Sequence, residues 1–433
     1  MSSKNYGSLH SCQSRLPAKQ LRDIPPTYAD YLEIAKLLKL QDSVFKKGLH
    51  HHEEHLFITT HQSFELWFKQ ILLDLKSLKN IMDDDEEPTT PEKEVVILER
   101  MDRIEKILKF SLGTFDLLET MPSLNFLEFR DYITPASGFQ SAQYKELEVM
   151  LGQRRFTSGK YLSILKGCDA EGYVRVKDAL DSKSFKDVLY EWMEALYDRN
   201  VDLMKEFQVK YEAVRQETLD YILSIKQDDE ETRKKLLERD FDGTLKYLQG
   251  EPLSRQEKQL YESETTPQEG GRSASSNSTS TDTSTAEESS SYNRSGTHDS
   301  TEEPIAESSS REWKERCAKR RLAILFVSCY RYTPELANAA KILEGAINLE
   351  QAFLMWKYRH ARMVERMIGH KTGTGGSTGV DYLDLTTKQR IFHDLWHVRS
   401  HLVTPTALPQ LDTFKYWIPS KNIFSEQLSR FDE

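Results

Sequence analysis

FLMWKYRHARMVERMIGHKTGTGGSTG, residues 353–379, is the stretch on which the interpretation of the fold depends. Its first half has the periodicity of an amphipathic helix, in which side chains three and four residues apart share one face. That face carries one imidazole within an aromatic and thioether stripe: Phe353, Trp356, His360, Met363 and Met367. Other faces are expected to carry the basic residues Lys357, Arg359, Arg362 and Arg366. The helix should end at Gly369, where a loop rich in Gly, Thr and Ser begins.

A second helix has the same character. In HLFITTHQSFELWFKQILLDLKSL, which starts at His55, one face combines Phe57, His61, Phe64 and Phe68. The opposite side is expected to carry Thr59, Gln62, Glu65 and Lys69. A lone histidine in an apolar stripe is usually an ordinary core residue, and two of them on two long helices raise the odds of a shared site; the pattern alone leaves core and ligand roles open. Helical proteins commonly hold haem between faces of this kind, with an imidazole as iron ligand.

Helical periodicity dominates the chain, and the two-residue alternation of strands is nearly absent, so the predicted fold class is all-α. Helices are expected near residues 27–40, 54–82, 92–119, 143–154, 186–203, 208–226, 230–248, 253–262, 312–330, 334–369 and 381–403. Residues 264–311 are Ser, Thr and Glu with almost no aliphatic content, which predicts a disordered insert. The predicted organisation is an irregular segment 1–26, one helical bundle domain over 27–263 and 312–415, and a tail 416–433.

The composition excludes several classes of protein. The 433 residues carry a net charge of −10, which argues against a nucleic-acid binder with a basic surface. No apolar run is long enough to cross a membrane, and the N-terminus lacks the apolar core of a secretory signal. Four scattered cysteines suit reduced thiols, so a cytoplasmic location is expected.

Two further histidine clusters invite a metal interpretation. HHHEEH, residues 50–55, lacks the spacing of the metalloprotease motif, and a solvated helix start is favoured. In RIFHDLWHVRSHL, spacings of four should place His393, His397 and His401 on one face of a helix. Three ligands on one straight face rarely converge on one ion, so an exposed or interfacial face is favoured there.

The glycine loop KTGTGGSTG, from Lys371, departs from both nucleotide-binding motifs and follows a helix instead of a strand. It can still present backbone N–H groups and the Thr374 hydroxyl to a small anion or zwitterion. In NFLEFRDYITPASGFQS, from Asn125, Arg130 lies among aromatic residues beside a turn. It could pair with a ligand carboxylate, or it could lie over aromatic faces with its guanidinium in water.

Taken together, these elements resemble the tryptophan 2,3-dioxygenase family. The segments that carry the resemblance are TYADYL (27–32), HEEHLFITTHQSFELWFKQI (52–71), FLEFRDYITPASGFQS (126–141) and residues 356–379. They lie on both sides of the Ser-rich insert and come in the family's order. The resemblance covers roughly residues 20–262 and 312–415.

The resemblance implies a cytosolic homotetramer with one haem b per subunit. The implied reaction inserts both atoms of O2 across the indole C2–C3 bond of L-tryptophan, giving N-formyl-L-kynurenine. It implies His360 as proximal iron ligand and His61 as the distal catalytic histidine. It also implies a set of substrate-binding residues: Phe57 and Phe126 at the indole, Arg130 at the carboxylate, Thr374 at the ammonium or carboxylate, and Tyr28 and Tyr31 reaching into a neighbouring subunit's pocket.

Two other functions compete with the dioxygenase. An electron carrier could use His61 and His360 as two axial haem ligands, but it would not need Arg130 and Thr374 to hold a zwitterion. A helical scaffold could recruit partners through the phosphorylated insert, in which case deleting residues 264–311 would abolish function.

Overall fold

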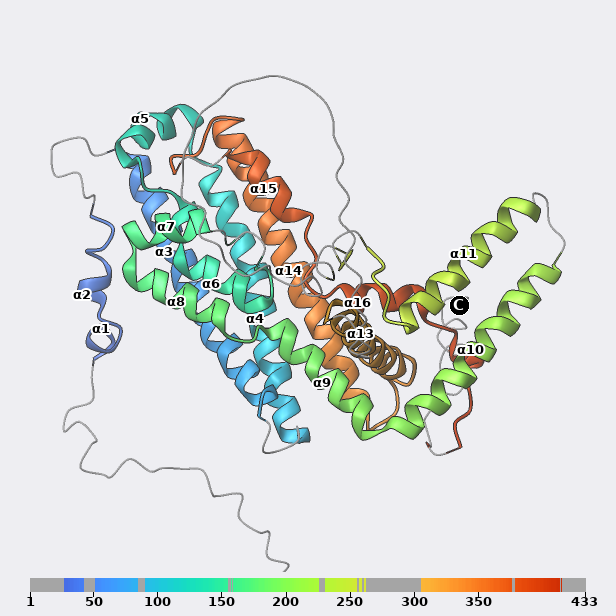
Figure 1. Ribbon diagram of the computed structural model, residues 1–433. Helices are drawn as coiled ribbons and strands as arrows, with labels where there is room; N and C mark the ends of the chain where they lie inside the picture. The colour runs from blue at the N-terminus through green and yellow to red at the C-terminus, as the bar shows by residue number, and fades with distance from the viewer. Residues whose placement is uncertain are drawn as a thin grey trace, which may run out of the picture.

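Three long helices lie side by side at the centre of the computed structural model (Figure 1). They are α3 (His52–Met82), α4 (Pro91–Leu118) and α14 (Ala337–Ile368). Each turns an apolar stripe inward, where Leu75, Ile104 and Leu349 are 0% exposed. Residues three and four apart make these stripes, so the packing follows from the sequence periodicity. The site described below lies within this layer.

The structure describes residues 27–42, 51–84, 90–154, 157, 159–225, 230–254, 257–258, 261, 305–375, 378–412 and 414. Within these ranges the chain is helical and contains no strand. The remaining helices are α1 (Tyr28–Tyr31), α2 (Ile34–Leu37), α5 (Ser123–Ile133), α6 (Ala142–Leu151), α7 (Gly159–Cys168), α8 (Ala170–Asp181), α9 (Phe185–Arg199), α10 (Val201–Ser224), α11 (Glu230–Leu248), α13 (Ile305–Cys329), α15 (Val380–Thr387) and α16 (His393–His397). Short 3-10 turns are η2 (Gly138–Gln140), η3 (Val398–His401) and η4 (Pro405–Ala407).

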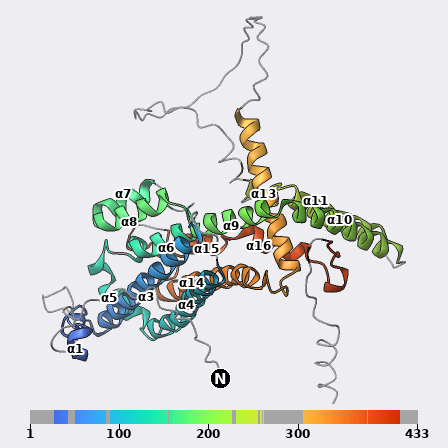
Figure 2. The same ribbon diagram turned by 90° about the horizontal axis from the view of Figure 1, so that it is seen from below.

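The peripheral helices cover the central three on different sides. α6 and α8 pack together beside α3, whereas α15 lies along α14. α9 packs against α13, and α10 and α11 run together as an arm that projects away from the helical body (Figures 1 and 2). In the described residues, no helix is both long and apolar enough to span a bilayer.

Local sequence signals set where several helices begin and end. The Thr90 hydroxyl accepts the Lys93 N–H at the start of α4, and a proline follows as the first helical residue. Ser184 opens α9 with a reciprocal capping box. α14 ends at Gly369, whose φ of 57° is a conformation that glycine adopts without a steric penalty.

The all-α prediction is confirmed, and the long helices agree with their expected ranges to within a few residues. Three helices were not expected at all: α5, α7 and α8. The break between α9 and α10 falls at Asn200, earlier than expected, and α6 ends at Leu151 instead of residue 154. α13 begins at Ile305, so its first seven residues, 305–311, fall within the predicted insert. The predicted segments 1–26 and 416–433, half of 253–262 and most of 264–311 lie outside the described residues.

The single helix expected over 381–403 is wrong. The chain forms α15, a non-helical link, α16 and the turn η3. The link is held by Glu350 of α14, whose carboxylate accepts the Ile391 N–H at 2.8 Å and the Phe392 N–H at 3.3 Å. These N–H groups therefore have acceptors without a helix, because a buried side chain from a distant segment supplies them.

Candidate active site

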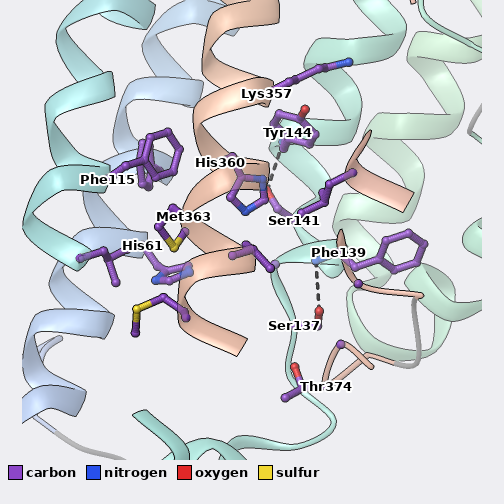
Figure 3. Close-up of a pocket in the computed structure, with 18 of the residues that line it drawn as sticks. His61, Phe115, Ser137, Phe139, Ser141, Tyr144, Lys357, His360, Met363 and Thr374 are labelled. Carbon is purple, nitrogen blue, oxygen red and sulfur yellow. Dashed lines mark hydrogen bonds between the residues drawn. The ribbon is translucent and has the colours of Figure 1, made fainter. Parts of the chain in front are cut away.

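His61 of α3 and His360 of α14 line the same cavity, which has a volume of about 250 Å³ (Figure 3). The cavity is bounded by α3, α4, α5, α6, α14 and α15, by the turn η2 and by the loop that follows α14. Six of the eight predicted site residues line it: Phe57, His61, Phe126, Arg130, His360 and Thr374. The two-histidine hypothesis from the sequence is thus matched by a shared cavity.

The His360 imidazole is held by aromatic neighbours. The rings of Phe115 and Trp356 lie 5.7 Å and 5.3 Å from it, centroid to centroid. Within the described residues it makes no hydrogen bond, and burial lowers its pKa to about 4. The ring is therefore neutral at physiological pH and keeps a lone pair for a metal ion. The neighbouring Trp356 has a buried indole N–H that likewise finds no partner among the described residues.

His61 has a defined tautomer. Its Nδ1 lies 2.7 Å from the carbonyl oxygen of Phe57. Because a carbonyl only accepts, Nδ1 carries the proton and donates it. Burial lowers the pKa of His61, against the opposing effects of that hydrogen bond and of Glu65, so the ring is neutral. Its Nε2 consequently has no proton and is an acceptor.

Aromatic rings form an apolar wall beside His61. The Phe57 ring lies 4.1 Å from the His61 ring and 5.6 Å from the Phe126 ring, between centroids. Both phenylalanines line the cavity. Such a wall suits a flat aromatic ligand, and it excludes water from the space near His61.

Arg130 and Thr374 connect the glycine loop to α5 and to the turn that follows α5, at one side of the cavity. The Arg130 guanidinium donates to the carbonyl of Thr372, and the Thr374 hydroxyl donates to the carbonyl of Ala136 at 2.7 Å. The glycine loop also packs tightly here, because a Cβ at Gly375 would lie 2.8 Å from that of Ser137. Both predicted polar side chains thus lie at the cavity, on a loop and a helix that touch.

Tyr28 and Tyr31 do not reach this cavity. They lie on α1, where they are 77% and 74% exposed. α1 buries none of its residues in the chain. Their predicted role in another subunit's pocket is not tested by a single chain.

The structure corrects the expected position of two charged residues. Lys357 was expected on a different face from His360, but it is 2% exposed, lines the same cavity and lies 2.7 Å from Glu148. Glu65 was expected opposite His61, yet it also lines the cavity, where Ser141 and Gln143 donate to its carboxylate. Lys145 and Glu148 of α6, which the sequence did not single out, line it as well. No local pattern reveals the contacts of Lys357 with Glu148 or of Glu65 with Ser141, because their members are far apart in the sequence.

In the described residues, the imidazoles of His393, His397 and His401 do not converge on one point. His393 and His397 lie 6.4 Å apart between ring centroids, while His401 packs on Tyr247 and bonds to Thr244. The three are therefore not on one helix face.

One group with ligand atoms within 4.8 Å combines His397 with Glu257 and Asp394. Its two carboxylates already bind Arg321, at 2.9 Å and 2.7 Å. At the start of α3 the His52 side chain is 99% exposed, as a solvated helix start requires.

The cavity residues fit a haem. A neutral imidazole without a protein partner is available as an iron ligand, and aromatic and thioether side chains provide flat apolar walls. The unpartnered Trp356 N–H is a polar group that an apolar ligand alone would leave unsatisfied.

Comparison with known proteins shows the family of the chain. The model of the tryptophan 2,3-dioxygenase family matches residues 15–265 and 274–402. A tryptophan 2,3-dioxygenase of Sorangium cellulosum is 33% identical over 400 residues, covering 89% of this chain and 85% of the relative. Tryptophan 2,3-dioxygenase 2 of Ralstonia nicotianae is 33% identical over 400 residues, which cover 89% of this chain and 96% of the relative. The tryptophan 2,3-dioxygenase of Dictyostelium discoideum is 30% identical over 403 residues, which cover 89% of this chain and 85% of the relative. The chain therefore belongs to the tryptophan 2,3-dioxygenase family.

Proposed function

We propose that this chain is a haem-dependent dioxygenase that adds both atoms of O2 to L-tryptophan. The indole C2–C3 bond is cleaved and N-formyl-L-kynurenine forms, which is the first step of tryptophan breakdown by the kynurenine pathway. One observation carries the proposal: two neutral histidines from different helices line a cavity that also has a guanidinium and a hydroxyl at one side. The family membership is consistent with it.

His360 is the residue that would hold the iron of one haem b per chain. Its lowered pKa keeps the imidazole free of a proton, so no proton must be displaced for ligation. Phe115 and Trp356 fix the ring from two sides, which restricts its orientation. When bound, haem supplies the redox chemistry that activates O2.

His61 orients the substrate. The indole N–H of tryptophan is a donor, and the unprotonated Nε2 of His61 is the acceptor that the tautomer leaves available. Phe57 and Phe126 pack against the indole ring and keep water away from the reacting carbons. His61 therefore acts mainly by positioning C2–C3, which lowers the barrier without a covalent step.

Arg130 and Thr374 bind the amino-acid end. A guanidinium forms a bidentate pair with a carboxylate, and a hydroxyl accepts from an ammonium or donates to a carboxylate. The Arg130 guanidinium already donates to the Thr372 carbonyl of the glycine loop. The same guanidinium would therefore bind both the loop and the substrate carboxylate. Substrate binding and loop position are coupled through this shared group.

Tyr28 and Tyr31 are proposed to complete the pocket of a neighbouring subunit in a homotetramer. The support is that α1 exposes both rings and buries nothing in its own chain. We also propose a cytoplasmic location, which is consistent with Cys168, Cys317 and Cys329 being free thiols.

The test is tryptophan oxidation by the haem-loaded protein. Purified chain with one haem per subunit, reduced and supplied with O2, should convert L-tryptophan to N-formyl-L-kynurenine with one O2 consumed per tryptophan. Fully haem-loaded protein without turnover would refute the proposal. A reduced spectrum unaffected by carbon monoxide would instead favour the electron carrier with two histidine ligands.

A further inference from the structure

Glu65 of α3 follows His61 by one helical turn and bonds to the start of α6. Its carboxylate accepts from the Ser141 hydroxyl at 2.6 Å and from the side-chain amide of Gln143 at 2.7 Å. The same amide nitrogen also donates to the main-chain carbonyl of Glu65, at 2.9 Å. Ser141 is in turn the N-cap of α6, because its hydroxyl accepts the Tyr144 N–H at 3.2 Å. Glu65 therefore fixes the first turn of α6 against α3.

The turn at residues 134–141, between α5 and α6, forms one side of the cavity. Within the described residues, every hydrogen bond between 134–143 and the central helices α3, α4 and α14 goes to Glu65. The other hydrogen bonds of the turn stay inside it or go to α5, α6 and the glycine loop. Phe139 packs edge-on against tyrosines of α7 and α15. Glu65 is thus the polar link between this turn and the three central helices.

The glycine loop rests on the same turn. Its Thr374 hydroxyl donates to the Ala136 carbonyl, and Gly375 lies so close to Ser137 that a Cβ there would be 2.8 Å from the serine Cβ. Figure 3 shows Ser141, Ser137 and Thr374 in succession along one side of the pocket. A displacement of the turn would therefore displace the surface on which the loop lies.

We propose that Glu65 is a positioning residue for tryptophan: by anchoring the 134–141 turn to α3, it sets where the glycine loop closes on the amino-acid end of the substrate. The inference rests on the proposed function, because it takes tryptophan as the ligand. Glu65 and His61 are one turn apart on a single helix, so one rigid element fixes both the acceptor for the indole N–H and the support of the loop. The separation between the two ends of the substrate site is thereby set by α3.

Two substitutions separate the anchor from a general effect on folding. Glu65→Ala removes both acceptor oxygens and leaves the Ser141 hydroxyl and the Gln143 amide without their partner. Glu65→Gln keeps an oxygen for Ser141, and the Gln143 amide can rotate to accept from the new amide. Glu65 opposes the effect of burial on the pKa of His61, so its neutralisation lowers that pKa further and leaves the imidazole neutral.

The first measurement is steady-state tryptophan oxidation with haem content determined on each sample. Glu65→Ala should lower kcat/KM roughly 10- to 150-fold, the value of one hydrogen bond to a charged group, mainly through KM and with full haem occupancy. Glu65→Gln should recover most of that loss. Asp74→Asn is the matched control, because Asp74 is a buried carboxylate of α3 that pairs with Arg103 and does not line the cavity. Its kcat/KM should stay within twofold of wild type.

The double variant Glu65→Ala/Gly375→Ala tests whether Glu65 acts through the loop. If both substitutions disturb the same contact between turn and loop, the double variant should lose little more than the weaker of the two single variants. Losses that multiply would show independent effects and overturn the inference. So would a Glu65→Ala enzyme within twofold of wild type, or one whose loss follows its haem content alone.

The second measurement does not depend on turnover. Backbone amide exchange of the purified protein, followed by mass spectrometry, should be faster in 134–143 and 370–375 of Glu65→Ala than in wild type, and unchanged there in Asp74→Asn. Unchanged exchange in Glu65→Ala would overturn the anchor whatever the activity. Haem-loaded wild type without turnover, together with faster exchange in Glu65→Ala, would instead refute the dioxygenase and the role in tryptophan binding while leaving Glu65 as the anchor of the turn.

Discussion

Gly375→Ala tests whether the glycine loop must lie against the 134–141 turn for substrate binding. The added Cβ would lie 2.8 Å from the Cβ of Ser137 and 3.0 Å from its Oγ. Carbon atoms pack best at about 3.5–4.0 Å, so the loop has to retreat by roughly 1 Å. Overpacking of this size costs about 1–3 kcal/mol. If only the closed loop binds tryptophan, kcat/KM should fall roughly 5- to 150-fold.

The assay is steady-state tryptophan oxidation with haem content measured on the same sample. The loss should be mainly an increase in KM with full haem occupancy, because the retreat loosens the Thr374 bond to Ala136 and leaves His360 untouched. Gly113→Ala is the matched control, since a Cβ there meets nothing within 4 Å. A Gly375→Ala enzyme whose kcat/KM is within twofold of wild type would refute the requirement for the closed loop.

Three further predictions concern single side chains. Arg130→Ala should lower kcat/KM roughly 30- to 5,000-fold, which corresponds to about 2–5 kcal/mol of transition-state binding. Arg399→Ala is the control, because the Arg399 guanidinium pairs with Glu344 and kcat/KM should not change. Unchanged turnover in Arg130→Ala would remove Arg130 from the site. His61→Phe should keep the ring contact with Phe57 and haem binding, but leave the indole N–H without an acceptor, at a cost of about 1–3 kcal/mol in kcat/KM measured with tryptophan. Burial lowers the pKa of His401 from 6.5 to about 4. As the pH falls from 6.5 to 4, this histidine therefore gains a proton in the unfolded state but not in the folded state. The free energy of unfolding should fall by about 3 kcal/mol at most over this range. In His401→Phe, the urea midpoint of unfolding should change less between pH 6.5 and pH 4 than it does in wild type. The same pH dependence in both proteins would contradict the burial argument.

The sequence predicted those parts of the fold that depend on local periodicity. The stripes around Leu75, Ile104 and Leu349 repeat at helical spacing, so α3, α4 and α14 could be placed closely. The link before α16 could not be anticipated, because its N–H groups are satisfied by Glu350 from another segment. Residues 381–403 have good helical periodicity, and a long-range hydrogen bond outweighs it.

The candidate site likewise contains residues that local periodicity predicts and residues whose position depends on contacts with distant segments. His61 and His360 could be proposed because each interrupts an aromatic stripe, and the cavity that both line forms once α3 and α14 pack against α4. Lys357 was placed on the wrong face, since its partner Glu148 lies in a different helix and the pairing leaves no local pattern. The role of Arg130 in holding the glycine loop was also invisible, because it depends on the backbone carbonyl of Thr372.

The most direct test of the account is the absorbance spectrum of the haem-titrated protein with and without His360. Wild type should bind one haem per chain with a Soret band that shifts when tryptophan is added to the reduced protein. His360→Ala should lose that band, whereas His393→Ala, which alters a histidine outside the cavity, should retain it. Stoichiometric haem binding with an unaltered Soret band in His360→Ala would contradict the central claim that His360 holds the iron.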